Sequence, residues 1–149
     1  MNDTEYERLM AAALRFISFR PRSEKEIRNF CTKTLKRHHT TAPLVVSKVL
    51  ERLTELGYVD DRKFAEWWIG QRTTSTPRGK RAIEAELKAK GIACPDIRID
   101  ERELAKKAVA KKLVHWQKFP PLERKKKIVG FLYRRGFDMS LVDDIGEKE

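Results

Sequence analysis

The residues of this sequence best suited to chemistry are clusters of lysine and arginine. The clusters are Arg20, Arg22 and Arg28; Arg78, Lys80 and Arg81; Arg124, Lys125, Lys126 and Lys127; and Arg134 and Arg135. Such side chains hold phosphate and carboxylate oxygens through salt-dependent ion pairs. With a net charge of +11 and a pI near 9.8, we expect an anionic partner, such as nucleic acid, a nucleoprotein or an acidic protein surface. The alternative is that these charges only solvate helix faces.

Aromatic residues are the second group that could contact a partner. Trp67 is the best surface candidate, because an indole can stack on a base or anchor an interface. Trp68 and Tyr58 lie on an inner stripe or at a unit junction, so we expect them in the core.

No pattern of residues predicts an enzyme. His38, His39 and His115 have no cysteine or carboxylate at metal-ligand spacing, and no Ser–His–Asp or Cys–His arrangement stands out. Asp60 and Asp61 are better explained as helix caps than as metal ligands. Gly79-Lys80-Arg81 lacks the other residues of a phosphate loop. We therefore expect no catalytic residue, metal or cofactor.

The sequence predicts a cytoplasmic protein without a membrane-spanning segment. Its acidic, polar start is unlike a signal peptide, and no apolar run approaches the ~18 residues that span a bilayer. Cys31 and Cys94 stand alone and are typical of reduced thiols.

Helix signals recur along the whole chain, so we predict an all-α fold. Ser23-Glu24-Lys25-Glu26 has the pattern of a capping box at a helix start. Gly57 follows a long apolar stripe and has the position of a helix-ending glycine.

An internal repeat organises these helices. Isoleucine begins three apolar series at i, i+4 and i+8: Ile27-Cys31-Leu35, Ile83-Leu87-Gly91 and Ile128-Leu132-Gly136. We therefore divide the chain into three repeats, 1–57, 58–100 and 101–149. Each repeat should contain three helices, and the third helix should be long in the first repeat and short in the other two. No repeat could bury much core alone, so we expect an elongated, curved array with a basic face.

Four motifs in order resemble those of the RecX family of regulators of the recombinase RecA. The motifs are Arg20-Pro21-Arg22-Ser23-Glu24-Lys25-Glu26-Ile27; Leu56-Gly57-Tyr58-Val59-Asp60-Asp61-Arg62-Lys63-Phe64-Ala65 with Trp68 and Arg72 downstream; Glu86-Leu87-Lys88-Ala89-Lys90-Gly91-Ile92; and Leu132-Tyr133-Arg134-Arg135-Gly136-Phe137-Asp138. The resemblance covers about residues 9 to 145. One departure is Leu35, which stands where the family's first repeat usually has a glycine.

The resemblance implies three tandem three-helix repeats without a catalytic centre. RecX-like proteins bind the RecA–single-stranded DNA filament, block its extension and reduce ATP hydrolysis and strand exchange in recombinational repair; some also bind DNA directly. We expect this chain to act so, most simply as an inhibitory monomer, through the basic clusters and Trp67. The alternative is a basic helical module that binds DNA without the recombinase.

Overall fold

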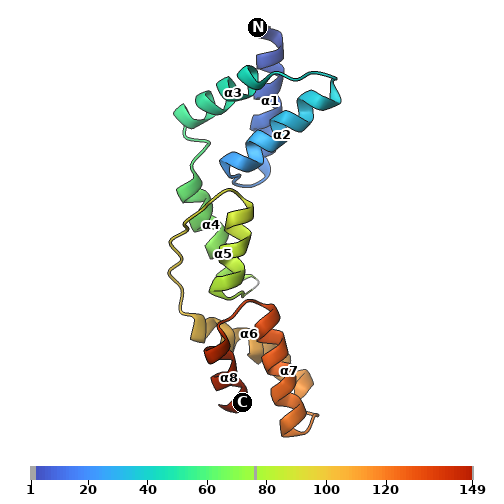
Figure 1. The fold of residues 1–149 in the computed structure, drawn as a ribbon, viewed down its shortest axis with the longest axis vertical. Coiled ribbons are helices and arrows are strands. Elements are labelled where there is room, and N and C mark those ends of the chain that lie inside the picture. The colour runs from blue at the N-terminus through green and yellow to red at the C-terminus, as the bar shows by residue number, and fades with distance from the viewer. Residues whose placement is uncertain (1–2, 76, 149) are drawn as a thin grey trace. The chain divides into compact units, whose positions relative to one another are not determined.

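The computed structural model describes residues 3–75 and 77–148, which contain eight α-helices and no strand (Figure 1). The helices are α1 (Asp3–Phe19), α2 (Glu24–Arg37), α3 (Pro43–Glu55), α4 (Asp61–Thr74), α5 (Lys80–Ala89), α6 (Glu101–Trp116), α7 (Pro121–Arg134) and α8 (Met139–Lys148). The predicted all-α fold is therefore confirmed. No helix in these residues is both long and apolar enough to cross a membrane.

The chain divides into two compact units. The N-terminal unit runs to Trp67 and also includes Lys90–Ile92, and the C-terminal unit comprises Trp68–Ala89 and the chain from Ala93 onward. The division falls inside α4, so this helix contributes to both units.

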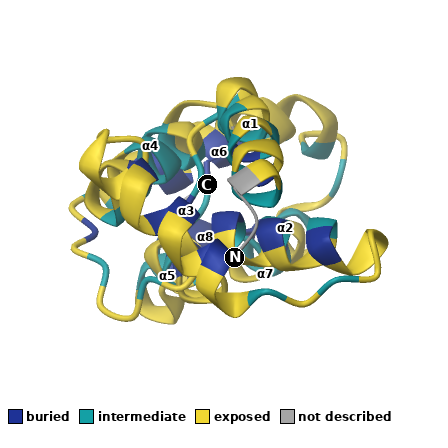
Figure 2. Cartoon of the chain, turned by 90° about the horizontal axis from the view of Figure 1, so that it is seen from above, coloured by how far each residue is buried: buried dark blue, intermediate teal, exposed yellow. Residues whose placement is uncertain are grey.

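Helices α1, α2 and α3 pack around one core in the N-terminal unit. The stripe Ile27, Cys31 and Leu35 of α2 is buried, as the repeat predicts. Five residues of α3 are buried against it: Val45, Val46, Val49, Leu50 and Leu53. Figure 2 shows buried segments of α2 and α3 in dark blue beside exposed segments of the same helices in yellow.

Local signals explain where α2 starts and stops. The Ser23 hydroxyl accepts a hydrogen bond from the Glu26 backbone, and the Glu26 carboxylate accepts one from the Ser23 backbone, so the predicted capping box is present. At Leu35 the helix does not stop but continues to Arg37. His39 then takes the left-handed conformation, with φ of 57°. The backbone N–H groups of His39 and Thr40 bond to the carbonyls of Lys36 and Leu35, as in a Schellman motif.

A second core lies in the C-terminal unit among α6, α7 and α8. It includes Leu104 and Val109 of α6, Ile128 and Leu132 of α7, and Phe137. The remaining buried members are Ala105, Ala108, Phe131, Val142 and Ile145.

The expected short third helix of the second repeat is not formed. Residues 92–100 contain no helix. Pro95 lacks an amide hydrogen and disfavours a helical conformation in the residue before it. Ile97 is buried and Ile99 half-buried, a spacing of two that suits an extended chain. The segment is therefore held by the burial of these two isoleucines in an extended conformation, and not by a helix.

The repeat is visible in the contacts at its junctions as well as in the sequence. At the start of α2, the Glu24 backbone N–H donates to the Asp61 carboxylate at 2.8 Å. At the start of α5, the Lys80 backbone N–H donates to the Glu101 carboxylate at 2.7 Å. In both cases the first residue of a later helix caps the second helix of the repeat before it.

The same junctions need glycine for close packing. A Cβ built on Gly91 would lie 2.9 Å from the Lys25 Cβ, at the start of α2. One built on Gly136 would lie 2.3 Å from the Ala82 Cβ, at the start of α5. The φ angles of Gly91 and Gly136 are 90° and 84°, in the region that L side chains avoid. Glycine is therefore required after α5 and after α7 for two reasons: the positive φ angle, and the lack of space for a Cβ atom.

Candidate nucleoprotein-binding surface

The two arginines before α2 are built into the fold. Arg20 forms an ion pair with the Glu26 carboxylate, and its guanidinium lies 5.8 Å from the centroid of the Trp67 ring. Arg22 stacks on the Phe16 ring at 3.9 Å and donates from Nε to the Phe16 carbonyl at 3.1 Å. Burial, and then repulsion from Arg20, lowers the pKa of Arg22. Both arginines are thus committed to internal contacts.

Glu26 is the acceptor that holds this region together. Its side chain is only 12% exposed and bonds to Arg20, to the Ser23 backbone and to the Lys90 ammonium at 3.2 Å. Burial alone would raise the pKa of Glu26, but the hydrogen bonds from Arg20, Ser23 and Lys90 lower it below its ordinary value. Sequence reasoning gave Glu26 only the role of a cap, because its link to Lys90 joins residues 64 positions apart.

Arg78, one of the predicted binding residues, belongs to a cluster around Glu86 in the C-terminal unit. The Glu86 carboxylate accepts hydrogen bonds from Trp68 Nε1 at 2.7 Å and from Arg72 Nε at 2.8 Å. Arg78 Nε lies 3.4 Å away from the same carboxylate. Sequence reasoning missed this role of Glu86, whose only signal was its place in the third family motif.

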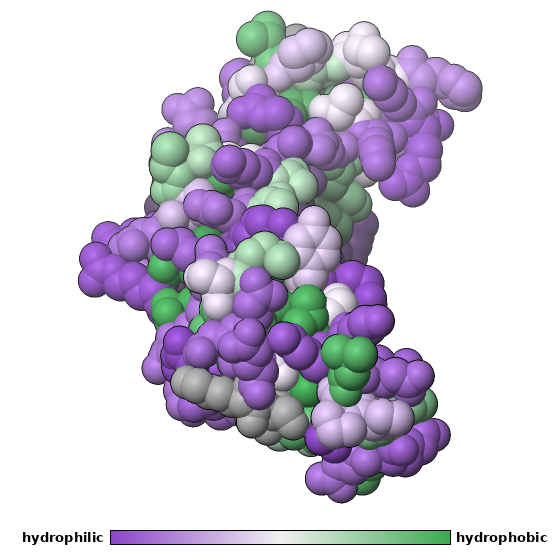
Figure 3. Space-filling model, turned by 60° about the horizontal axis from the view of Figure 1, so that its bottom comes forward, coloured by the Kyte–Doolittle hydropathy of each residue, from purple (hydrophilic) through white to green (hydrophobic). Residues whose placement is uncertain are grey.

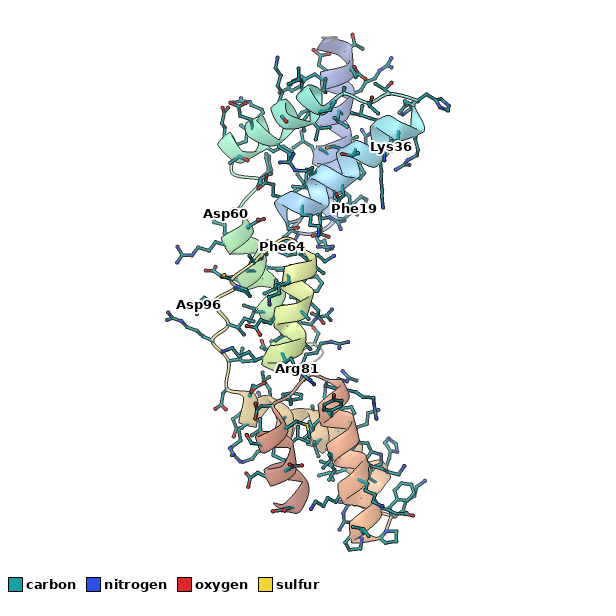
Figure 4. All side chains as sticks on the ribbon, viewed as in Figure 1. Phe19, Lys36, Asp60, Phe64, Arg81 and Asp96 are labelled. Atoms are coloured by element: carbon teal, nitrogen blue, oxygen red, sulfur yellow. The ribbon has the colours of Figure 1, made fainter. Side chains whose placement is uncertain are left out.

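Arg81 and Arg135 each lie over an aromatic ring. Figure 4 labels Arg81 in the first turn of α5, where it donates to the Tyr133 carbonyl at 3.0 Å and lies 4.8 Å from the Tyr133 ring centroid. Arg135 lies 5.0 Å from the Phe131 ring centroid, and burial followed by repulsion from Arg78 lowers its pKa. Arg81 thus links the start of α5 to α7, whereas Arg135 contacts a ring within the helix that it caps.

The basic residues of α7 differ because several of their charges have no acidic partner among the described residues. Lys126, Lys127 and Arg134 form no ion pair with the described carboxylates, whereas Lys125 pairs with Glu147 at 3.6 Å. Of the other predicted residues, Arg28 pairs with Glu24 at 3.0 Å, and the Lys80 side chain is exposed. Arg124 is half-buried, with no hydrogen-bond partner for Nε among the described atoms.

A groove gathers these free cations. Lys126, Lys127, Gly130 and Arg134 line it from α7, and Trp116 lines it from the end of α6. The α7 residues lie at positions i, i+1, i+4 and i+8, which share one helix face. Trp116 packs edge-to-face with Phe131, with ring centroids 5.5 Å apart. The groove thus combines three cationic side chains, one half-buried indole and a glycine, which adds no side chain to the lining.

The stretch of sequence that contains the groove residues is strongly basic. Residues 104–137 contain eleven Lys and Arg side chains and a single acidic one, Glu123. Hydrophilic side chains dominate the face shown in Figure 3, and hydrophobic residues appear there only as small patches. The net charge of residues 101–149 as a whole does not reveal this basic stretch, because most carboxylates of that region lie before residue 104 or after residue 137.

The aromatic residues predicted to lie on the surface (Trp67) or in the core (Tyr58 and Trp68) do not all have the expected burial. Trp67 is half-buried between the Arg20 guanidinium and the Phe64 ring, whose centroid lies 6.1 Å away. The expectation of a buried Tyr58 is wrong, since the side chain is 50% exposed. Tyr58 directly follows the turn at Gly57, where its N–H closes the end of α3 by bonding to the Leu53 carbonyl. Trp68 is half-buried rather than part of either core cluster.

The histidines and cysteines form no metal cluster in residues 3–75 and 77–148. Asp60 caps α4 as predicted, by accepting from the Lys63 backbone at 3.1 Å. Cys31 is buried, and this burial raises the pKa of its thiol to about 11, whereas Cys94 is exposed.

With eight helices and no strand in its described residues, and with a net positive charge, the protein belongs to the class of basic α-helical repeat proteins. Family models for RecX match two parts of the chain, the second three-helix domain at residues 60–99 and the third at residues 100–145. The chain belongs to the RecX family, as the resemblance of its four motifs predicts.

Relatives named regulatory protein RecX match nearly the whole chain. One from Chlorobium phaeobacteroides is 38% identical over 144 residues, which cover 93% of this chain and 91% of the relative. One from Mycolicibacterium smegmatis is 33% identical, over 95% of this chain and 79% of the relative.

A solved structure has the same fold. The crystal structure of RecX from Lactobacillus salivarius superposes with a TM-score of 0.75 over 99% of this chain and 97% of that chain, at 20% sequence identity.

Proposed function

We propose that this protein is a regulator that binds the RecA–single-stranded DNA filament and reduces its extension, its ATP hydrolysis and its strand exchange. The observation that carries the proposal is its similarity to regulatory RecX proteins over more than nine-tenths of the chain. The target and the inhibitory effect follow from what the family resemblance implies.

The distribution of charge supports an anionic nucleoprotein as the partner. A filament presents DNA phosphates and repeated protein surfaces, and cations that release counterions from phosphates bind with a strong dependence on salt. We further propose that the repeats 1–57, 58–100 and 101–149 each contribute weak contacts, which add up through their high effective concentration on one chain. A monomer acting in the cytoplasm suffices for this mechanism.

The test is ATP hydrolysis by a bacterial RecA on single-stranded DNA while this protein is titrated from well below one copy per recombinase. We expect the rate to fall at substoichiometric ratios, because one bound regulator would stop extension of a filament containing many recombinase protomers. Hydrolysis that stays unchanged up to equimolar protein would refute the proposal.

A second candidate function is direct DNA binding without recombinase. The excess of ten positive charges within residues 104–137 favours it, because such a patch attracts any nucleic acid. The two functions differ in one respect: only the first requires tighter binding to the filament than to its bare DNA.

A further inference from the structure

We infer that the groove between the end of α6 and the outer face of α7 is a binding site for single-stranded nucleic acid. In this site a base stacks on Trp116, and phosphates pair with Lys126, Lys127 and Arg134. The inference rests on the proposed function only in taking the bound strand to be the one that the filament carries.

The available cations distinguish this groove from the other basic clusters. Elsewhere the predicted arginines are paired or stacked: Arg20 with Glu26, Arg78 beside Glu86, and Arg81 over Tyr133. None of the three cations of the groove has a described carboxylate within ion-pair distance. An incoming phosphate therefore has no internal carboxylate to displace.

The spacing of the cations suits a strand that runs along α7. Lys126 and Arg134 are eight residues apart, which corresponds to about 12 Å of helix. That length exceeds the ~3.4 Å of duplex axis that each phosphate of one strand occupies, so the two cations can pair with different phosphates. The Lys127 ammonium lies 4.6 Å from the Phe119 ring centroid, so an apolar surface positions this cation rather than a counter-charge.

The indole indicates a single strand. In a duplex each base pairs through its edge and stacks on its neighbours, so only an unpaired base can place its face on an aromatic side chain. Trp116 lines the groove while it packs against Phe131, and this contact orients its ring.

Gly130 keeps the groove open. A Cβ added there would meet only the Arg134 Nη1 atom, at 3.2 Å, which is the end of a flexible side chain. A larger residue at this position would extend into the groove, and replacing glycine inside a helix favours the helix. Gly130 thus offers a way to block the site without removing any of its cations.

The first experiment measures binding of the full chain to a fluorescent oligothymidylate by anisotropy over a range of salt concentrations. In the variant with Lys126→Gln, Lys127→Gln and Arg134→Gln, the slope of log K against log salt should fall by about 2, because each ion pair with a phosphate contributes ~0.7 to that slope. The control replaces three exposed lysines of the N-terminal unit, Lys33, Lys36 and Lys48, by glutamine. Its slope should stay within about 0.5 of the original, since fewer than one phosphate ion pair would then be affected.

Two single variants test the stacked base and the open floor. Trp116→Ala should weaken oligonucleotide binding about tenfold, the effect of removing one base–aromatic stack. Gly130→Gln should weaken it by at least as much, because the longer side chain occupies the groove without adding a charge, while circular dichroism stays helical. Gly130→Ala is the matched control, because it supports the helix and adds little bulk, and it should bind nearly as the original does.

The outcomes separate this inference from the proposed function. Loss of oligonucleotide binding in these variants supports the site even if hydrolysis by recombinase proves insensitive to the protein. If the variants bind oligonucleotide and respond to salt as the original does, the inference is overturned. Weaker action on the recombinase in that case would mean that the groove contacts protein instead. Equal binding to duplex and single strand, unaffected by Trp116→Ala, would overturn the stacking.

Discussion

Gly79 gives the sharpest test of the packing between α5 and α7. A Cβ at this position would lie 2.3 Å from the Gly136 carbonyl oxygen and 2.4 Å from the Phe137 nitrogen. Both are backbone atoms, so no side-chain rotation can relieve the contact. The Gly79 N–H also donates to the Arg135 carbonyl at 2.8 Å, and the two backbone segments must separate to accept a methyl group.

The magnitude follows from overpacking and from the broken hydrogen bond. Overpacking costs about 1–3 kcal/mol, and a buried backbone group left without a partner costs about 1–3 kcal/mol. Gly79→Ala should therefore lower the free energy of unfolding of the C-terminal unit by about 2–6 kcal/mol, which corresponds to a melting temperature lower by roughly 10 °C or more.

Gly70→Ala is the matched control within α4. No heavy atom lies within 4 Å of a Cβ built there, and alanine is favoured over glycine inside a helix by about 1 kcal/mol. Thermal unfolding followed by circular dichroism should thus shift in opposite directions for the two substitutions. A Gly79→Ala variant that melts with the original protein would refute the close backbone contact.

Three further predictions concern stability and reactivity. His39→Gly should raise the free energy of unfolding by about 1 kcal/mol in urea titrations, because glycine adopts the left-handed φ of 57° without strain; no change would mean that His39 makes compensating contacts. A thiol reagent at pH 8 should modify Cys94 quickly and Cys31 only after unfolding, because burial raises the Cys31 pKa to about 11; rapid reaction of two thiols would contradict this burial. The lowered pKa of Glu26 stabilises the fold above the ordinary pKa of a glutamate, about 4.3, and this contribution is lost as the pH falls through the folded value. The Glu26→Gln variant should therefore lose stability at pH 7 and show a weaker dependence on pH between about 5 and 3, and a pH dependence equal to that of the original would refute the ion-paired carboxylate.

Sequence could predict the parts of the fold that depend on local signals. The capping box at Ser23 and the left-handed glycine at Gly136 depend on a few neighbouring residues, and both are present. The end of α2 was harder to predict, since histidine rarely takes the conformation that His39 has here. In the extended segment after Pro95, Ile99 packs against the core formed by α6, α7 and α8, and no local pattern records such a tertiary contact.

The candidate site was predictable only in part. The run Arg124–Lys127 was evident from its charge, but which of its members lack partners depends on the position of Glu147 in α8. In the same way, Arg20 and Arg78 resemble binding residues in sequence and prove to be paired with Glu26 and Glu86 in the fold. A count of charges cannot separate these cases, because pairing is decided by tertiary contacts.

The most direct test of the central claim is the affinity of this protein for the assembled filament compared with its affinity for each component. The exposed Cys94 can carry a fluorophore for anisotropy, since Cys31 is buried. We predict that at physiological salt the RecA filament on single-stranded DNA binds at least about tenfold more tightly than the same DNA or RecA alone, because contacts to both components add on one chain. Binding to bare DNA that equals binding to the filament would contradict the account and leave a DNA-binding module in its place.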